Sequence, residues 1–163
     1  MTAEDRTIQR DRMRFIKNSL SSNLALLGIL FDVFYFVSIY KSDVGSYYYN
    51  YIIGVSIVYN LVFMLAAFLA SEGVKNYKKE YSYLLAVIGL VQIVRIFIIP
   101  MQAHAATVAV NGAEVTVMQN GQFYRVVVYL IISAACLIAS AVVNFIRCRE
   151  LAEHLKTLEA QGA

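Results

Sequence analysis

Charged residues are scarce in this sequence and make up only 15% of its 163 residues, whereas an average soluble domain is about 25% charged. Hydrophobic residues make up 60% of the chain, and its mean hydropathy is +0.61. One proline and eight glycines leave little room for flexible linkers or disordered segments. This composition argues against a water-soluble domain and indicates a single membrane-embedded unit.

Cysteine is also scarce, and its placement excludes an internal disulfide. Cys136 and Cys148 are 12 residues apart, which is about 18 Å along a helix, whereas a disulfide needs Cα atoms within about 7 Å of each other. Neither cysteine has a histidine or second cysteine at metal-ligand spacing. The sequence contains no P-loop, GxGxxG, HExxH, GxSxG or CxxC motif. We therefore predict no catalytic residue, no metal site and no cofactor.

Four apolar runs are long enough to cross a membrane, which takes about 20 residues of helix. These predicted spans are 20–40, 50–70, 82–101 and 124–146. The sequence therefore predicts an all-α integral membrane protein, a bundle of four transmembrane helices in one membrane domain. Residues 1–19 form a predicted basic amphipathic arm, and residues 147–163 form a predicted helical tail.

The basic residues are distributed unevenly between the segments that connect these spans. Eleven of the fourteen lysines and arginines lie in 1–19, 71–81 and 147–163. Cytoplasmic loops of membrane proteins carry an excess of such residues, so we expect both the N-terminus and the C-terminus to be cytoplasmic. The same bias, with the lack of a sorting signal, favours a bacterial cytoplasmic membrane.

The outer loop at 102–123, between the third and fourth spans, has the pattern of a β-hairpin. Two short β-branched runs flank Asn111-Gly112, a dipeptide that is typical of tight hairpin turns. An isolated two-stranded hairpin is only marginally stable in water. We therefore expect this hairpin to pack on the helix ends, on a second copy or on a partner protein.

Two charged residues, Asp32 and Arg95, lie inside the predicted spans. An unpaired charge at the bilayer centre costs about 2.5–3.5 kcal/mol on insertion scales, so such residues usually face the bundle interior and pair. Asp32 lies 12 residues into the first span and Arg95 lies 13 residues into the third. Both spans run outward, so the two depths differ by about 1.5 Å. This match predicts an intramembrane ion pair.

Other polar and small residues fall on the same helix faces. Asn60 lies near the middle of the second span, Gln92 lies one turn before Arg95, and Tyr35 shares a face with Asp32. We group these five residues as a predicted intramembrane polar site. Small and polar residues also line interfaces between membrane helices. The predicted helix-packing residues are Gly28, Ser56, Gly89, Ser133, Ser140 and Asn144.

Three roles remain open for the polar site: holding helices together, lining a path for a substrate or ion, or contacting another protein's helices. The small size, absent motifs, outer hairpin and amphipathic tails favour a non-catalytic accessory or regulatory subunit that binds a larger membrane complex. The alternative is a small oligomeric transporter or channel with Asp32, Asn60, Gln92 and Arg95 along its path. A lesser alternative is a membrane enzyme that acts on lipid or quinone.

The N-terminal arm interleaves arginines with apolar residues, which is typical of a helix lying on anionic lipid. Its acidic residues, Glu4, Asp5 and Asp11, dilute the positive charge that nucleic-acid binding requires. The expected partners are therefore membrane lipids, together with another membrane protein or copies of this chain, and not nucleic acid.

Overall fold

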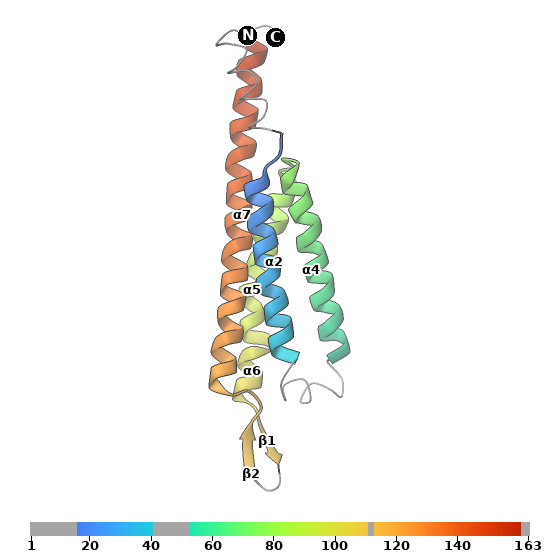
Figure 1. The fold of residues 1–163 in the computed structure, drawn as a ribbon, viewed down its shortest axis with the longest axis vertical. Coiled ribbons are helices and arrows are strands. Elements are labelled where there is room, and N and C mark those ends of the chain that lie inside the picture. The colour runs from blue at the N-terminus through green and yellow to red at the C-terminus, as the bar shows by residue number, and fades with distance from the viewer. Residues whose placement is uncertain (1–15, 41–52, 111–112, 161–163) are drawn as a thin grey trace.

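A computed structural model describes residues 16–40, 53–110 and 113–160 of the chain (Figure 1). Its elements are α2 (Ser19–Tyr40), α4 (Ile53–Lys75), α5 (Glu80–Ile98), α6 (Pro100–Ala105), β1 (Thr107–Val110), β2 (Ala113–Thr116) and α7 (Asn120–Ala160). Within the described ranges, four helical segments are long and apolar enough to cross a membrane. The prediction of four such helices, as an integral membrane protein requires, is therefore confirmed.

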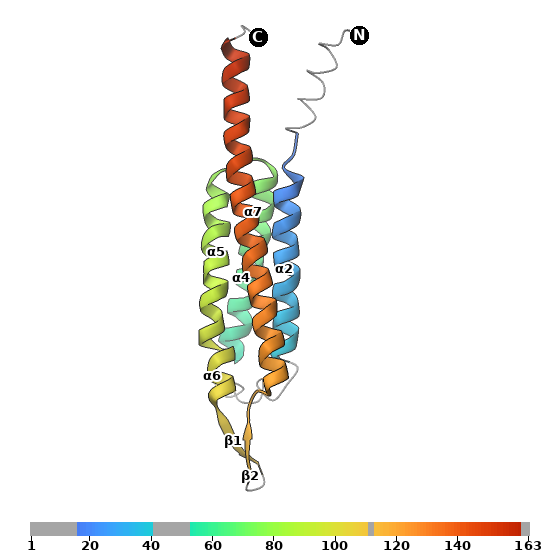
Figure 2. The same cartoon turned by 90° about the vertical axis from the view of Figure 1, so that its left-hand side faces the viewer.

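The four long helices run alternately up and down in one bundle (Figures 1 and 2). Helix α7 packs against α2 and α5, and α4 packs against the same two helices from the opposite side. The outward faces carry exposed leucine, valine, isoleucine and phenylalanine side chains along all four helices. This arrangement leaves one polar stripe per helix facing the interior and apolar side chains facing outward, as a lipid environment favours.

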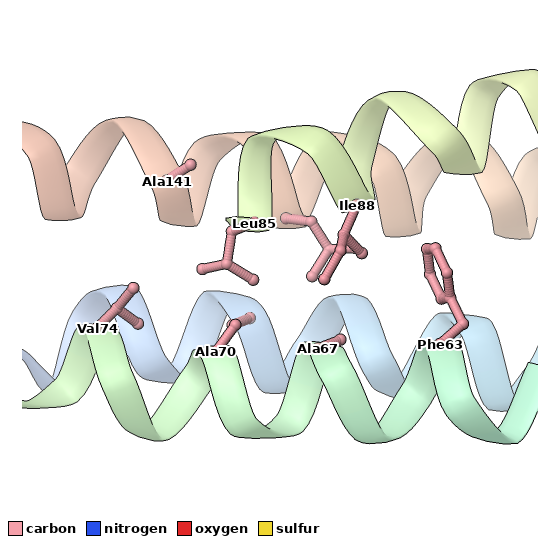
Figure 3. Close-up of a cluster of buried hydrophobic side chains, with 9 residues drawn as sticks. Phe63, Ala67, Ala70, Val74, Leu85, Ile88 and Ala141 are labelled. Atoms are coloured by element: carbon pink, nitrogen blue, oxygen red, sulfur yellow. The ribbon is translucent and has the colours of Figure 1, made fainter. Parts of the chain in front are cut away.

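Part of the bundle interior is a cluster of buried apolar side chains from all four long helices (Figure 3). In this view Phe63, Ala67 and Val74 follow one face of α4, opposite Leu85 and Ile88 of α5. With Ala70, these α4 residues follow one another at steps of three or four positions, which places them on one face of a helix. Alanines on this face allow the backbones to approach closely, so dispersion contacts can hold the helices together.

Both of the predicted helix-packing glycines lie where α7 comes close to its neighbours. A Cβ atom on Gly28 of α2 would lie 2.9 Å from Leu137 Cγ, and one on Gly89 of α5 would lie 2.7 Å from Ile138 Cγ1. Both distances are too short for a carbon–carbon contact, which is optimal at about 3.5–4.0 Å. The absence of a side chain at these positions therefore permits the observed spacing of the helices.

The helix boundaries differ from the predicted spans at three places. Helix α4 continues to Lys75 instead of ending near residue 70, and α7 begins at Asn120 instead of residue 124. The third helix, predicted to reach residue 101, ends at Ile98 because Pro100 follows. Proline cannot continue a helix but fits its first turn, and here it opens α6.

Strands β1 and β2 pair antiparallel beyond the end of the bundle, with Thr107 opposite Thr116. The Val117 N–H donates to the Ala106 carbonyl at 3.0 Å, and Met118 is buried beside α7. The His104 ring stacks on Phe123 with centroids 4.5 Å apart. These contacts attach the base of the strand pair to the helix ends.

Four predictions fall on residues whose placement is not described. These are most of the arm at 1–19, the start of the second span, the turn at Asn111-Gly112 and the side chain of Ser56. They lie outside the described residues and stay predictions. Of the predicted tail, the structure describes helix up to Ala160.

Candidate functional site

The two charges inside the bundle are in direct contact. Arg95 Nη1 of α5 lies 2.9 Å from Asp32 Oδ1 of α2, and the two side chains are 3% and 2% exposed. Each residue belongs to the buried stripe of its helix, which also contains Gly28 on α2 and Gly89 on α5. The stripe of small residues thus aims both charged side chains at the bundle interior, where each neutralises the other.

Arg95 also binds the two predicted amide residues. Its Nη1 donates to Gln92 Oε1 at 2.7 Å, and its Nη2 donates to Asn60 Oδ1 on α4. Gln92 Nε2 donates in turn to Ser133 Oγ of α7 at 3.1 Å, and Ser133 Oγ donates to the carbonyl of Gly28 at 2.8 Å. One hydrogen-bonded network, which we call the central network, therefore joins all four long helices.

Three aromatic rings surround the same guanidinium group. Arg95 Cζ lies 4.7 Å from the ring centroid of Tyr35, 4.9 Å from that of Phe63 and 5.5 Å from that of Tyr59. A cation within about 6 Å of a ring centroid is attracted by the negative face of the ring. Tyr59 and Phe63 were not among the predicted site residues. Tyr59 and Phe63 are four positions apart, which places them on one face of the helix close to Asn60. This spacing is the sequence signal that could have identified them.

Two buried polar atoms in or beside the central network have no hydrogen-bond partner in the described part of the chain. They are Asp32 Oδ2 and the Tyr35 hydroxyl, which lie one helical turn apart on α2. The carboxylate oxygen can accept a hydrogen bond, and the hydroxyl group can donate or accept one. Because Arg95 balances the Asp32 charge, the network as a whole carries no net charge.

A second polar cluster, which we call the serine–asparagine cluster, lies toward the end of the bundle where α2 begins. Asn144 Oδ1 of α7 accepts from Asn18 Nδ2 at 2.8 Å, and Asn144 Nδ2 donates to Ser82 Oγ at 2.7 Å. Ser21 and Ser140 bond each other's carbonyl oxygens at 2.7 and 2.6 Å. This cluster ties α7 to α2 and α5 where the central network does not reach.

The predicted polar and packing residues therefore separate into groups. Seven lie in or beside the central network, namely Asp32, Arg95, Asn60, Gln92, Tyr35, Ser133 and Gly28. Ser140 and Asn144 belong to the serine–asparagine cluster, and Gly89 packs on Ile138. The sequence prediction missed Asn18, Ser21 and Ser82, although polar residues near helix ends were their visible signal.

The described residues offer little for metal or thiol chemistry. Over 16–40, 53–110 and 113–160, no three histidine, cysteine, aspartate or glutamate side chains gather as metal ligands would. Cys136 and Cys148 are both free thiols and are half-buried.

The chain was also compared with protein-family models, with curated proteins and with solved structures, and none of them matches it.

Proposed function

We propose that this chain is a non-catalytic membrane protein that binds a larger membrane complex as an accessory or regulatory subunit. The observation that carries the proposal is the enclosure of the central network. Its charged and amide side chains are at most 3% exposed and bond to one another across four helices. Such a network holds a bundle together and leaves contact with a partner to surfaces outside it.

Two elements project from the bundle and offer such surfaces. Helix α7 extends well beyond the start of α2 and the end of α4, and the β1–β2 pair extends from the opposite end (Figures 1 and 2). On the α7 extension, Leu155 is 51% exposed among polar neighbours. An apolar side chain on a helix without neighbours gains stability when a partner covers it.

The proposed orientation places the α7 extension in the cytoplasm of a bacterial cell. Lys75, Lys78, Lys79, Arg147 and Arg149 all belong to the end of the bundle from which α7 extends. The positive-inside rule assigns such an end to the cytoplasm. The β1–β2 pair would then face the outside, and the two projections would meet partners on opposite sides of the membrane.

The test is native mass spectrometry of the chain extracted from its own membrane in mild detergent. We expect an unrelated membrane protein to co-purify in a fixed stoichiometric ratio. Leu155→Ser should reduce its recovery, because the variant removes the exposed apolar side chain. Lys156→Ser, the neighbouring exposed position, is the matched control and should leave recovery unchanged. Recovery of the chain alone, or only as copies of itself, would contradict the proposal.

A second candidate function, a small oligomeric transporter or channel, is favoured by one observation. Asp32 Oδ2 and the Tyr35 hydroxyl are buried without a hydrogen-bond partner in the described residues. Buried polar atoms are usually satisfied, so a transported ion or proton could bind to this pair. Because four helices enclose little space, a pathway would need several copies of the chain.

A further inference from the structure

A cavity of about 250 Å³ lies where the turn before α5 meets α7, on the side of the bundle from which the α7 extension leaves. Its lining residues are Lys79, Phe145, Cys148, Arg149 and Ala152. Two cationic side chains thus face a pocket that also has an aromatic wall. We propose that this pocket binds the phosphate headgroup of an anionic phospholipid. The inference rests on the membrane embedding of the helices and not on the proposed subunit role.

The charges around the cavity favour an anion. Lys79 Nζ lies 4.8 Å from the ring centroid of Phe145, which holds the ammonium group against the pocket wall. Arg149 uses its Nε to bond Glu153 Oε1 at 3.0 Å, in a pair that is mostly exposed and therefore weak. Glu80, the first residue of α5, adds an opposing charge, but the start of a helix carries a positive partial charge.

The turn that carries Lys79 is held in place by α7. Cys148 Sγ donates to the Tyr77 carbonyl at 3.2 Å, and Asn144 Nδ2 donates to the Lys78 carbonyl at 3.3 Å. Tyr77 has a positive φ of 57°, which ends α4 and reverses the chain. Because these intramolecular contacts fix the turn that carries Lys79, they order one wall of the pocket, which lowers the entropic cost of binding a headgroup.

The surface next to the cavity fits acyl chains and distinguishes a lipid from free phosphate. The Tyr83 ring of α5 packs edge-on against the Phe145 ring of α7, with ring centroids 6.1 Å apart. The two side chains are 59% and 41% exposed. One turn further into the bundle, Val87 on α5 and Val142 on α7 are also more than half exposed. An apolar strip therefore continues from the cationic pocket along both helices. Basic pockets between membrane helices are typical sites for phosphate headgroups.

The proposal is tested by titrating the full chain with phosphatidylglycerol or with phosphatidylcholine of the same acyl chains, and counting bound lipids by native mass spectrometry. Each basic residue near an anionic headgroup contributes about 1 kcal/mol, so two residues give about 30-fold tighter binding of phosphatidylglycerol. Lys79→Gln/Arg149→Gln should abolish this preference. Lys156→Gln is the matched control, because it removes an exposed cation of α7 outside the cavity, and it should keep the preference.

Two further arms make the outcome decisive. The thermal stability of each variant is measured without added lipid. If the double variant does not fold, the two single variants replace it, and each should weaken the preference for phosphatidylglycerol by about fivefold. Glycerol 3-phosphate is added at the lipid concentration and should not compete, because it lacks the acyl chains. Equal binding of the two lipids by the wild type, or retention of the preference by the cavity variants, would overturn the proposal. Competition by glycerol 3-phosphate would overturn the choice of a lipid.

Discussion

Arg95→Met is expected to lower the free energy of unfolding by about 3–5 kcal/mol, the largest single effect in this chain. The variant leaves the Asp32 carboxylate 2% exposed with no opposite charge. It also removes the donors that bind Gln92 and Asn60. Asp32→Leu should cost a similar amount, because it leaves the buried guanidinium without its counter-ion.

The double variant Asp32→Leu/Arg95→Met should be far less destabilised than the sum of the two single variants. An apolar pair leaves no charge buried alone, and such replacements are often close to neutral. Unfolding of the purified protein in mixed micelles measures all three variants as a double-mutant cycle. Arg125→Met, at an exposed position near the start of α7, is the control and should have little effect. Additive costs, or silent single variants, would show that the ion pair does not hold the helices together.

Asn144→Leu is expected to be the next most damaging substitution, with a loss of about 2 kcal/mol of unfolding free energy. Asn144 is fully buried and bonds Asn18, Ser82 and the carbonyl of Lys78. Hydrogen bonds between membrane helices contribute about 0.6 kcal/mol each on average. Leucine keeps the approximate size of the side chain but forms none of these hydrogen bonds, so the buried side chains of Asn18 and Ser82 lose a partner.

The same unfolding measurement checks this prediction. Asn23→Leu is a matched control, because Asn23 is an exposed asparagine within α2. It should change the unfolding free energy by no more than a few tenths of a kcal/mol, as is usual at exposed positions. An equal effect of the two variants would mean that the serine–asparagine cluster does not contribute through its hydrogen bonds.

The helices and the contact between the two charges follow from one-dimensional rules. Apolar runs of about 20 residues locate membrane helices, and a constant rise per residue compares depths along them. Asp32 and Arg95 were paired because a charge inside a membrane span needs a partner and because their depths match, and the structure places them 2.9 Å apart. The end of α4 did not follow, because polar side chains at a helix end resemble a loop.

The second span was predicted to end near residue 70, whereas α4 ends at Lys75. Ser71 and Glu72 read as the beginning of a polar loop, yet Ser71 bonds Ser22 Oγ at 3.0 Å and Glu72 pairs with Lys75 at 3.1 Å. Both contacts stabilise helix beyond residue 70. One partner lies 49 positions away, so no local pattern reveals it.

The aromatic rings around Arg95 were missed for a related reason. Tyr59 is 41% exposed, and a mostly apolar helix carries many aromatic residues that face lipid. What distinguishes Tyr59 and Phe63 from other aromatic residues is their contact with Arg95, which lies on a different helix. The orientation of one helix against another sets such contacts, and hydrophobic periodicity does not determine that orientation closely.

We infer that the central network is an enclosed core that holds the helices together and not a water-filled path. Ser133→Cys tests it most directly, because the substitution is nearly isosteric and Ser133 is fully buried within the network. In native membrane vesicles, with Cys136 and Cys148 replaced by alanine, a charged thiol reagent should leave position 133 unmodified. The same reagent should label Glu114→Cys on the exposed strand β2 completely. Labelling of position 133 at a comparable rate would reveal water in the core and contradict the account in favour of a transport pathway.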